Sequence, residues 1–163
     1  MTSGWRDGYA PVQLRLNHVD DRFADIIQGG WLTSHQPDGA WLYGADVSVR
    51  PEYRGRGLAT ALYVAWREVV WRLKLKGQVT AGLIPGYGAL KETMPVEQHH
   101  EGVLAGRVWD PIVSMQMNVG FELRGLLAKY LNDPLCDNYC VLPLLGSEKR
   151  VRGASRERGM SGT

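Results

Sequence analysis

The sequence predicts one α/β (α+β) domain with a mixed, mostly antiparallel sheet, whose central parallel pair of strands is joined by a long crossover helix. Three observations predict this fold. Residues 41–49 end in the alternating Val47 and Val49 of a half-buried strand, and residues 78–84 form a second apolar strand. Between them, residues 58–75 repeat apolar side chains at helical spacing. A strand, a helix and a strand in this order form a parallel pair through a right-handed crossover.

Length and charge predict one folded domain and a different C-terminal segment. The chain has 163 residues, of which 44% are hydrophobic and 22% charged, so residues 1–145 can form a domain with a core. Residues 146–163 hold five basic and two acidic residues, whereas the rest holds 14 basic and 15 acidic ones. We therefore predict a basic disordered tail over 146–163 and no general nucleic-acid surface on the domain. Docking of the tail on nucleic acid or an acidic partner is the alternative.

The sequence has no run of about 18 apolar residues and no signal-peptide pattern, which predicts a cytoplasmic protein without membrane contact. Two cysteines, Cys136 and Cys140, are too few for a disulfide framework. We expect both as buried free thiols on one face of a strand. A zinc site that adds His99 and His100 is the alternative, and we expect no metal.

Little regular structure is predicted before residue 41. Residues 11–17 alternate as a strand, residues 18–27 fit either a short helix or a loop, and residues 31–35 are predicted as a short strand. Residues 36–39 form a predicted turn, because proline presets φ and glycine accepts a positive φ.

The long helix has the clearest periodicity in the chain. Its predicted core face is a stripe of Leu58, Leu62, Ala65, Val69 and Leu73, which Trp66, Val70 and Trp71 widen. This stripe is expected to lie on the sheet.

The second half of the chain predicts shorter elements. Residues 96–101 fit a helix inside a polar segment. Asp110 as a cap and Pro111 at the first position predict the start of a short helix that runs to Met117. Residues 121–127 and 138–145 are the last two predicted strands.

A basic, glycine-containing turn joins the central strand to the long helix. Pro51 ends the strand because it has no N–H for a ladder hydrogen bond. Gly55 and Gly57 allow a sharp turn and leave room for a ligand against the main chain. The unpaired N–H groups of the first helical turn, together with Arg54 and Arg56, form an anion site. The residues alone therefore predict binding of phosphate or pyrophosphate.

The spacing of this turn resembles a known family. Arg54-x-x-Gly57-x-Ala59, placed between a strand and a helix, is similar to the Arg/Gln-x-x-Gly-x-Gly/Ala signature of the GNAT superfamily of N-acetyltransferases. The resemblance covers residues 11–145, since a short helix that ends in Gly120-Phe121 and two strands also fit. Residues 84–87 and the insertion after them look like acetyltransferase domains fused to carbon–nitrogen hydrolases. Complete GNAT domains have two helices in their first part, so this domain is expected to be short at its N-terminus.

The resemblance implies an acetyl-CoA-dependent N-acetyltransferase in which an amine of the acceptor attacks the thioester directly in a ternary complex. The turn would bind the pyrophosphate of coenzyme A, and strand N–H groups would polarise the thioester carbonyl. The implied cofactor-binding residues are Val47, Ser48, Val49, Arg54, Gly55, Arg56, Gly57, Leu58, Ala59 and Thr60. The expected partners are acetyl-CoA and the amine, and an uncovered sheet face would favour a homodimer.

The residues that move protons are the open part of this interpretation. Asp46 is a candidate base, with a structural hydrogen bond or ion pair as the alternative. Tyr43 lies on the opposite face of the strand from Asp46 unless a bulge intervenes. Tyr87 and Tyr139 are candidate acids, with packing as the alternative role. Many family members have a tyrosine acid where this chain has Gln116, and an amide cannot act as a general acid.

Two further alternatives stay open at this point. His99 and His100 are expected on a solvated polar face, with a histidine that lines the acceptor pocket as the alternative, and His35 is not placed. The short N-terminal part and Gln116 also favour a second class of function, a non-catalytic acyl-CoA-binding or regulatory GNAT-like domain.

Overall fold

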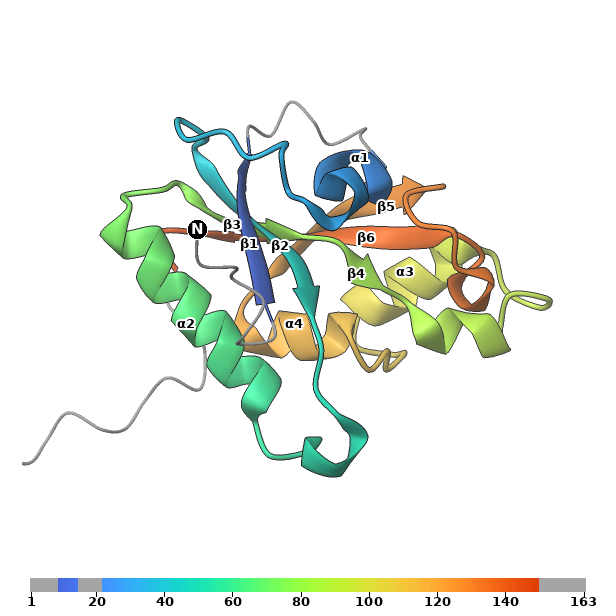
Figure 1. The fold of residues 1–163 in the computed structure, drawn as a ribbon. Coiled ribbons are helices and arrows are strands. Elements are labelled where there is room, and N and C mark those ends of the chain that lie inside the picture. The colour runs from blue at the N-terminus through green and yellow to red at the C-terminus, as the bar shows by residue number, and fades with distance from the viewer. Residues whose placement is uncertain (1–8, 15–21, 150–163) are drawn as a thin grey trace, which may run out of the picture.

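One six-stranded sheet organises the computed structural model, which describes residues 9–14 and 22–149 (Figure 1). Its strands are β1 (Tyr9–Leu14), β2 (Trp41–Val47), β3 (Gly77–Thr80), β4 (Gly82–Leu83), β5 (Glu122–Ala128) and β6 (Tyr139–Gly146). Strands β2 and β3 are parallel, and the other pairings of these strands are antiparallel. The predicted mixed, mostly antiparallel sheet with a central parallel pair is confirmed.

Four α-helices lie against this sheet in the described ranges. They are α1 (Phe23–Ile27), α2 (Leu58–Arg72), α3 (Val96–Leu104) and α4 (Val113–Val119). Short 3₁₀ turns are η2 (Gln28–Gly30), η3 (Pro51–Tyr53), η4 (Pro85–Ala89) and η5 (Pro134–Cys136). Helix α2 is the predicted crossover between β2 and β3. Helices α2, α3 and α4 lie on one side of the sheet, and α1 lies on the other (Figure 1).

The sheet opens between its two central segments. Pairing of β2 with β3 ends at Gly44 opposite Thr80, and β4 then pairs with β6 rather than with β2. The predicted strand over residues 78–84 is therefore two short strands, interrupted at Ala81. Strand β5 lies along the other edge of β6. The ends of β2 and β4 thus separate in the middle of the molecule.

The face that α2 buries differs from the predicted stripe. Tyr63, Trp66, Arg67 and Val70 are the buried residues of the helix, whereas Leu58 is 43% exposed. Leu73 and Trp71 are also exposed. Gly44 of β2 explains why the face with Trp66 is buried, because a Cβ at residue 44 would lie 1.9 Å from a ring carbon of Trp66. The indole packs directly on a backbone without a side chain, and this contact sets the rotation of the helix.

The segment after α1 corrects the predicted strand over residues 31–35. Leu32 has a φ of 54° and donates its N–H to the carbonyl of Ile27, and His35 donates to the carbonyl of Leu32. These local bonds form turns in place of a ladder. The turn over residues 36–39 is confirmed by the hydrogen bond from Gly39 N–H to the carbonyl of Gln36. Of residues 11–17, the structure describes 11–14, which lie in β1.

The C-terminal end of β6 is held by a buried arginine on α2. Arg67 is 1% exposed, and its guanidinium donates to the carbonyl oxygens of Leu145 at 3.4 Å and Gly146 at 2.5 Å, and also to that of Lys149. Ser147 donates its N–H to the carbonyl of Lys76. The chain is therefore ordered through these contacts beyond residue 145, and residues 150–163 of the predicted tail lie outside the described ranges.

Both cysteines are free and buried, as predicted, but they do not share a strand face. Cys136 ends the turn η5 and packs with α3 and α4 residues, whereas Cys140 lies on β6 and packs on the α1 side. Burial raises the pKa of both thiols, that of Cys140 to about 12. Both therefore remain protonated at neutral pH.

Candidate functional site

A β-bulge redirects the last residues of β2. Tyr9 of β1 pairs with Val47 and Pro11 pairs with Gly44, so Ala45 and Asp46 together oppose one residue of β1. Such a bulge breaks the alternation of side chains along a strand. Tyr43 still lies on the α1 side of the sheet and Asp46 on the α2 side, next to Tyr63, and both line one cavity that reaches both sides.

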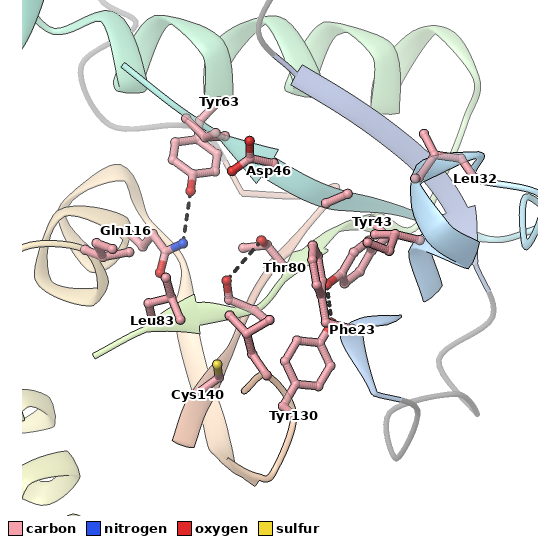
Figure 2. Close-up of a pocket in the computed structure, with 17 residues that line it drawn as sticks. Phe23, Leu32, Tyr43, Asp46, Tyr63, Thr80, Leu83, Gln116, Tyr130 and Cys140 are labelled. Carbon is pink, nitrogen blue, oxygen red and sulfur yellow. Dashed lines mark hydrogen bonds between the residues drawn. The ribbon is translucent and has the colours of Figure 1, made fainter. Parts of the chain in front are cut away.

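The cavity lies where β2 and β4 separate and encloses about 390 Å³. This volume is in the range of small-molecule sites. Its walls come from both sides of the sheet: Tyr63 and Gln116 from the α2 and α4 side, and Phe23 and Tyr130 from the α1 side (Figure 2). The lining is mainly apolar, with a few polar groups between. A ligand could therefore extend from one face of the sheet to the other.

Three polar side chains gather on the α2 side of the cavity. The amide Nε2 of Gln116 donates to the hydroxyl oxygen of Tyr63 at 2.9 Å. Asp46, an exposed carboxylate, lies beside the Tyr63 ring (Figure 2). Burial, and to a smaller extent the charge of Asp46, raises the pKa of Tyr63, against a lowering effect of the Gln116 hydrogen bond. Tyr63 is thus a protonated phenol at neutral pH.

The α1 side of the cavity holds a pair of tyrosines. The hydroxyl groups of Tyr43 and Tyr130 are hydrogen-bonded to each other, and burial raises the pKa of Tyr43 to about 12. Thr80 donates its hydroxyl to the carbonyl of Gly44 at 2.7 Å, which satisfies that carbonyl at the last pair of the parallel ladder. These contacts fix the wall with neutral groups.

The basic turn lies open to solvent at the start of α2 (Figure 1). Gly55 and Gly57 have φ values of 73° and 76°, and no atom lies within 4 Å of a Cβ built at either. Within the described ranges, nothing accepts a hydrogen bond from the backbone N–H groups between Gly55 and Thr60. Arg54 differs, since its N–H donates to Pro51 and its Nε to the carbonyl of Val49. The turn thus presents successive backbone N–H donors with open space at Gly55 and Gly57, beside the guanidinium of Arg56.

The predicted acids and histidines lie elsewhere. Tyr87 is buried on η4 against the ring of His99, with 5.4 Å between ring centroids, and Tyr139 packs in the same cluster. Neither lines the cavity. The expected solvated face is wrong for His99, which is fully buried, because α3 turns that side toward the core. Burial lowers the pKa of His99 and of His100.

Asp46 and Val47, which the sequence singled out, line the cavity, and so do Tyr63 and Tyr130, which it did not single out. Ser48 and Val49 continue past the end of β2 and do not line it. A tyrosine inside an amphipathic helix has the same pattern as a core residue, so no local signal marked Tyr63.

The described ranges contain neither a helix that could cross a membrane nor a cluster of metal-binding side chains. No helix there combines the length and the apolar character that a membrane crossing requires. No group of three or more His, Cys, Asp or Glu side chains in those ranges is arranged to hold a metal ion.

Comparison with known sequences gives two relatives in Bacillus subtilis (strain 168). The chain is 35% identical over 122 residues to the probable hydrolase YhcX, a match over 74% of this chain and 24% of that protein. It is 30% identical over 131 residues to the uncharacterized N-acetyltransferase YkwB, a match over 80% of this chain and 58% of that protein. The chain thus spans about a quarter and somewhat over half of these relatives. No protein-family model matches the chain.

Solved structures with a similar fold include two GNAT-like domains. The GphF GNAT-like decarboxylase in complex with isobutyryl-CoA has a TM-score of 0.71 at 17% identity, over 86% of this chain and 71% of that one. The loading GNATL domain of CurA from Lyngbya majuscula has a TM-score of 0.72 at 19% identity, over 86% and 70% of the two chains. In its fold, the chain is a GNAT-like domain, as the motif from Arg54 to Ala59 predicted.

Proposed function

We propose that the chain is an acetyl-CoA-dependent N-acetyltransferase that transfers the acetyl group to an amine by direct attack. The observation that supports this most is that two features lie next to each other. The basic turn has free N–H groups, and the end of β2 just before it lines a cavity. A phosphate group suits the turn, and a thioester suits the cavity. The similarity to an N-acetyltransferase and to an acyl-CoA complex supports the same ligand class.

The turn would hold the pyrophosphate of coenzyme A mainly through main-chain donors. The N–H groups of Gly55 to Thr60 and the positive end of the α2 dipole attract an anion, and Arg56 adds a charge. Arg56 stacks on Tyr53, with its guanidinium carbon 5.4 Å from the ring centroid, which orients it at the turn. Open space at Gly55 and Gly57 lets phosphate oxygens approach the backbone.

The cavity would hold the acyl end and the acceptor amine. Asp46 would take a proton from the amine at the mouth of the cavity, since it is exposed and lies where β2 and β4 separate. N–H groups at the end of β2 would polarise the thioester carbonyl, an effect worth about 3–4 kcal/mol per donor in comparable sites. The amine nitrogen then bonds to the carbonyl carbon, and the carbon–sulfur bond breaks.

Calorimetric titration of the full chain with acetyl-CoA and with coenzyme A tests this proposal. Both ligands are expected to bind, and Gly57→Val is expected to weaken both about tenfold or more, since a β-branched residue at a φ of 76° distorts the turn. Gly106→Val is the matched control, because Gly106 has a φ of 68° and open space but lies after α3. Absence of binding to the wild-type chain would remove the proposal.

A binding or regulatory domain without transferase activity is the second candidate. The observation that favours it is Gln116, which stands where a general acid is common in the family. A thiol-release assay with acetyl-CoA over a panel of amines separates the two. Binding of acetyl-CoA without amine-dependent thiol release would favour the second candidate. Isobutyryl-CoA in the same assay tests the preference for acetyl groups.

A further inference from the structure

The hydroxyl of Tyr63 is oriented by its neighbours. It accepts a hydrogen bond from Nε2 of Gln116 at 2.9 Å, and no acceptor for its own proton occurs within the described ranges. The ring is 2% exposed and makes edge contacts to Trp66 and Phe121, with centroids 5.5 Å and 5.1 Å away. The ring is thus fixed by its packing, and Tyr63 and Gln116 both line the cavity between β2 and β4 (Figure 2).

We infer that Tyr63 is the proton donor to the thiolate that leaves in the reaction, and that Gln116 positions it. This inference rests on the proposed function. The amide N–H of Gln116 occupies a lone pair of the phenol oxygen, so the phenol proton is directed away from Gln116. Asp46 lies beside Tyr63, so the groups that would accept and donate protons share one side of the cavity.

The protons of the reaction balance with these two residues. The amine nitrogen attacks the carbonyl carbon of the thioester and loses one proton to Asp46. The carbon–sulfur bond breaks with its electron pair on sulfur, and the O–H of Tyr63 transfers its proton to that sulfur. The products are an amide and the thiol of coenzyme A. The tyrosinate regains a proton through solvent as Asp46 releases one, so both residues return to their starting states.

Protonation at neutral pH fits this role. Burial raises the pKa of Tyr63, so the phenol carries its proton when the thiolate forms. The nearby charge of Asp46 acts in the same direction. An adjacent hydrogen-bond donor stabilises the tyrosinate that results, as the lowering effect of Gln116 on the same pKa indicates.

Binding of coenzyme A and of dethio-coenzyme A, which lacks the sulfur, tests the inference without a known acceptor. The wild-type chain is expected to prefer coenzyme A over the dethio compound at pH 8.5, where part of the thiol is ionised. Tyr63→Phe should reduce this preference by roughly two- to tenfold, the value of one hydrogen bond. Affinity for the dethio compound should be unchanged, because the phosphate contacts at the turn remain.

Tyr87→Phe is the matched control, since it removes a buried phenol outside the cavity and is expected to keep the wild-type preference. Thermal unfolding of each variant shows whether it is folded. If coenzyme A binds and Tyr63→Phe keeps the wild-type preference, the assignment of Tyr63 is overturned and the proposed function stands. If the wild-type chain binds neither compound, the proposed function falls and the assignment with it.

Gln116 variants test the direction of the hydrogen bond. In Gln116→Leu the phenol loses its donor, so the preference for coenzyme A is expected to decrease. In Gln116→Glu the carboxylate accepts the phenol proton and turns it away from sulfur, so the decrease should match that of Tyr63→Phe. An increase in Gln116→Leu would mean that the wild-type amide oxygen withholds the proton, which overturns the positioning role.

Discussion

His99 shows how one buried side chain sets the response of the fold to acid. It is fully buried on α3, and neither ring nitrogen has a hydrogen-bond partner within the described ranges. Burial lowers its pKa, and the raising effect of Asp110 is smaller. Folding therefore favours the neutral form of His99.

We predict that the free energy of unfolding decreases as the pH falls from 8 toward 5. The unfolded chain takes up a proton on this imidazole near its ordinary pKa of 6.5, whereas the folded chain takes it up only at lower pH because burial lowers the pKa of His99. Urea unfolding at both pH values measures the effect. His99→Leu is expected to reduce the pH dependence, because it removes the buried imidazole. An unchanged slope in His99→Leu would contradict the assignment.

At the scale of residues, local chemistry was predictable and long-range contacts were not. The basic turn and Asp46 follow from residues near in sequence, because a strand, two glycines and a helix start fix their positions. The contact between Tyr63 and Gln116 joins residues 53 apart, and it depends on how α2 and α4 pack. For the same reason Tyr87 and Tyr139 could be proposed as acids from their side-chain chemistry, but the sequence could not show that they lie away from the cavity.

At the scale of elements, the close approach of α2 to β2 gives a sharp prediction. Gly44→Ala would bring Cβ to 1.9 Å from the Trp66 ring, so the helix must shift. We expect a loss of about 1–3 kcal/mol in the free energy of unfolding, as for other overpacked cores. Urea unfolding measures it, with Gly125→Ala as the control, because a Cβ there meets no atom within 4 Å. Equal effects of the two changes would contradict this packing.

Arg67 joins α2 to the end of β6, and its removal is expected to loosen both. Arg67→Met keeps the length of the side chain but leaves carbonyls of Leu145 and Gly146 without their donor. We expect a loss of about 2 kcal/mol or more in the free energy of unfolding. Arg72→Met, an exposed change on the same helix, is the control. A loss no larger than that of the control would contradict the role.

Arg67→Lys tests the geometry of this contact. One ammonium group lacks the planar arrangement of donors that reaches several carbonyls at once. The lysine variant is therefore expected to recover only part of the loss.

The helix α2 also shows why element positions were easier to predict than element faces. Its start and length follow from the sequence, but two of its faces have large apolar side chains at helical spacing. The periodicity predicted that the face with Leu58 and Leu73 is buried, but both side chains are exposed. The face with Trp66 packs on the sheet instead, because Gly44 has no side chain and leaves space for the indole. Which face of α2 is buried therefore depends on a residue of β2 and cannot be predicted from the helix sequence alone.

At the scale of the whole molecule, the proposed ligand would connect α2 with both separated strands. We predict that acetyl-CoA at 100 times its dissociation constant raises the free energy of unfolding by about 2.7 kcal/mol, as for any ligand that binds the folded state alone. Urea unfolding with and without ligand measures the increase. Gly57→Val at the same ligand concentration should show less of it. An increase equal to that of the wild type would place the ligand elsewhere.

The parallel pair of β2 and β3 and the existence of the last two strands were predictable because the crossover helix and these strands have strong patterns, whereas the position of β6 between β3 and β5 was not. The gap at Ala81 was not, since residues 78–84 read as one strand. The bulge at Ala45 and Asp46 was an open alternative, decided by pairing with β1. Together these two irregularities create the cavity, so the least predictable backbone is also the backbone that forms the candidate site.

The short parallel ladder has a mechanical consequence. Among the described strands, β1 and β2 are linked to the remainder of the sheet by four residue pairs, from Trp41 opposite Gly77 to Gly44 opposite Thr80. A small change in twist at this ladder would change the distance between β2 and β4 beyond it, where the two strands are not paired. Substitutions that change the twist at Gly77 would therefore change the width of the cavity, although Gly77 is not one of its lining residues.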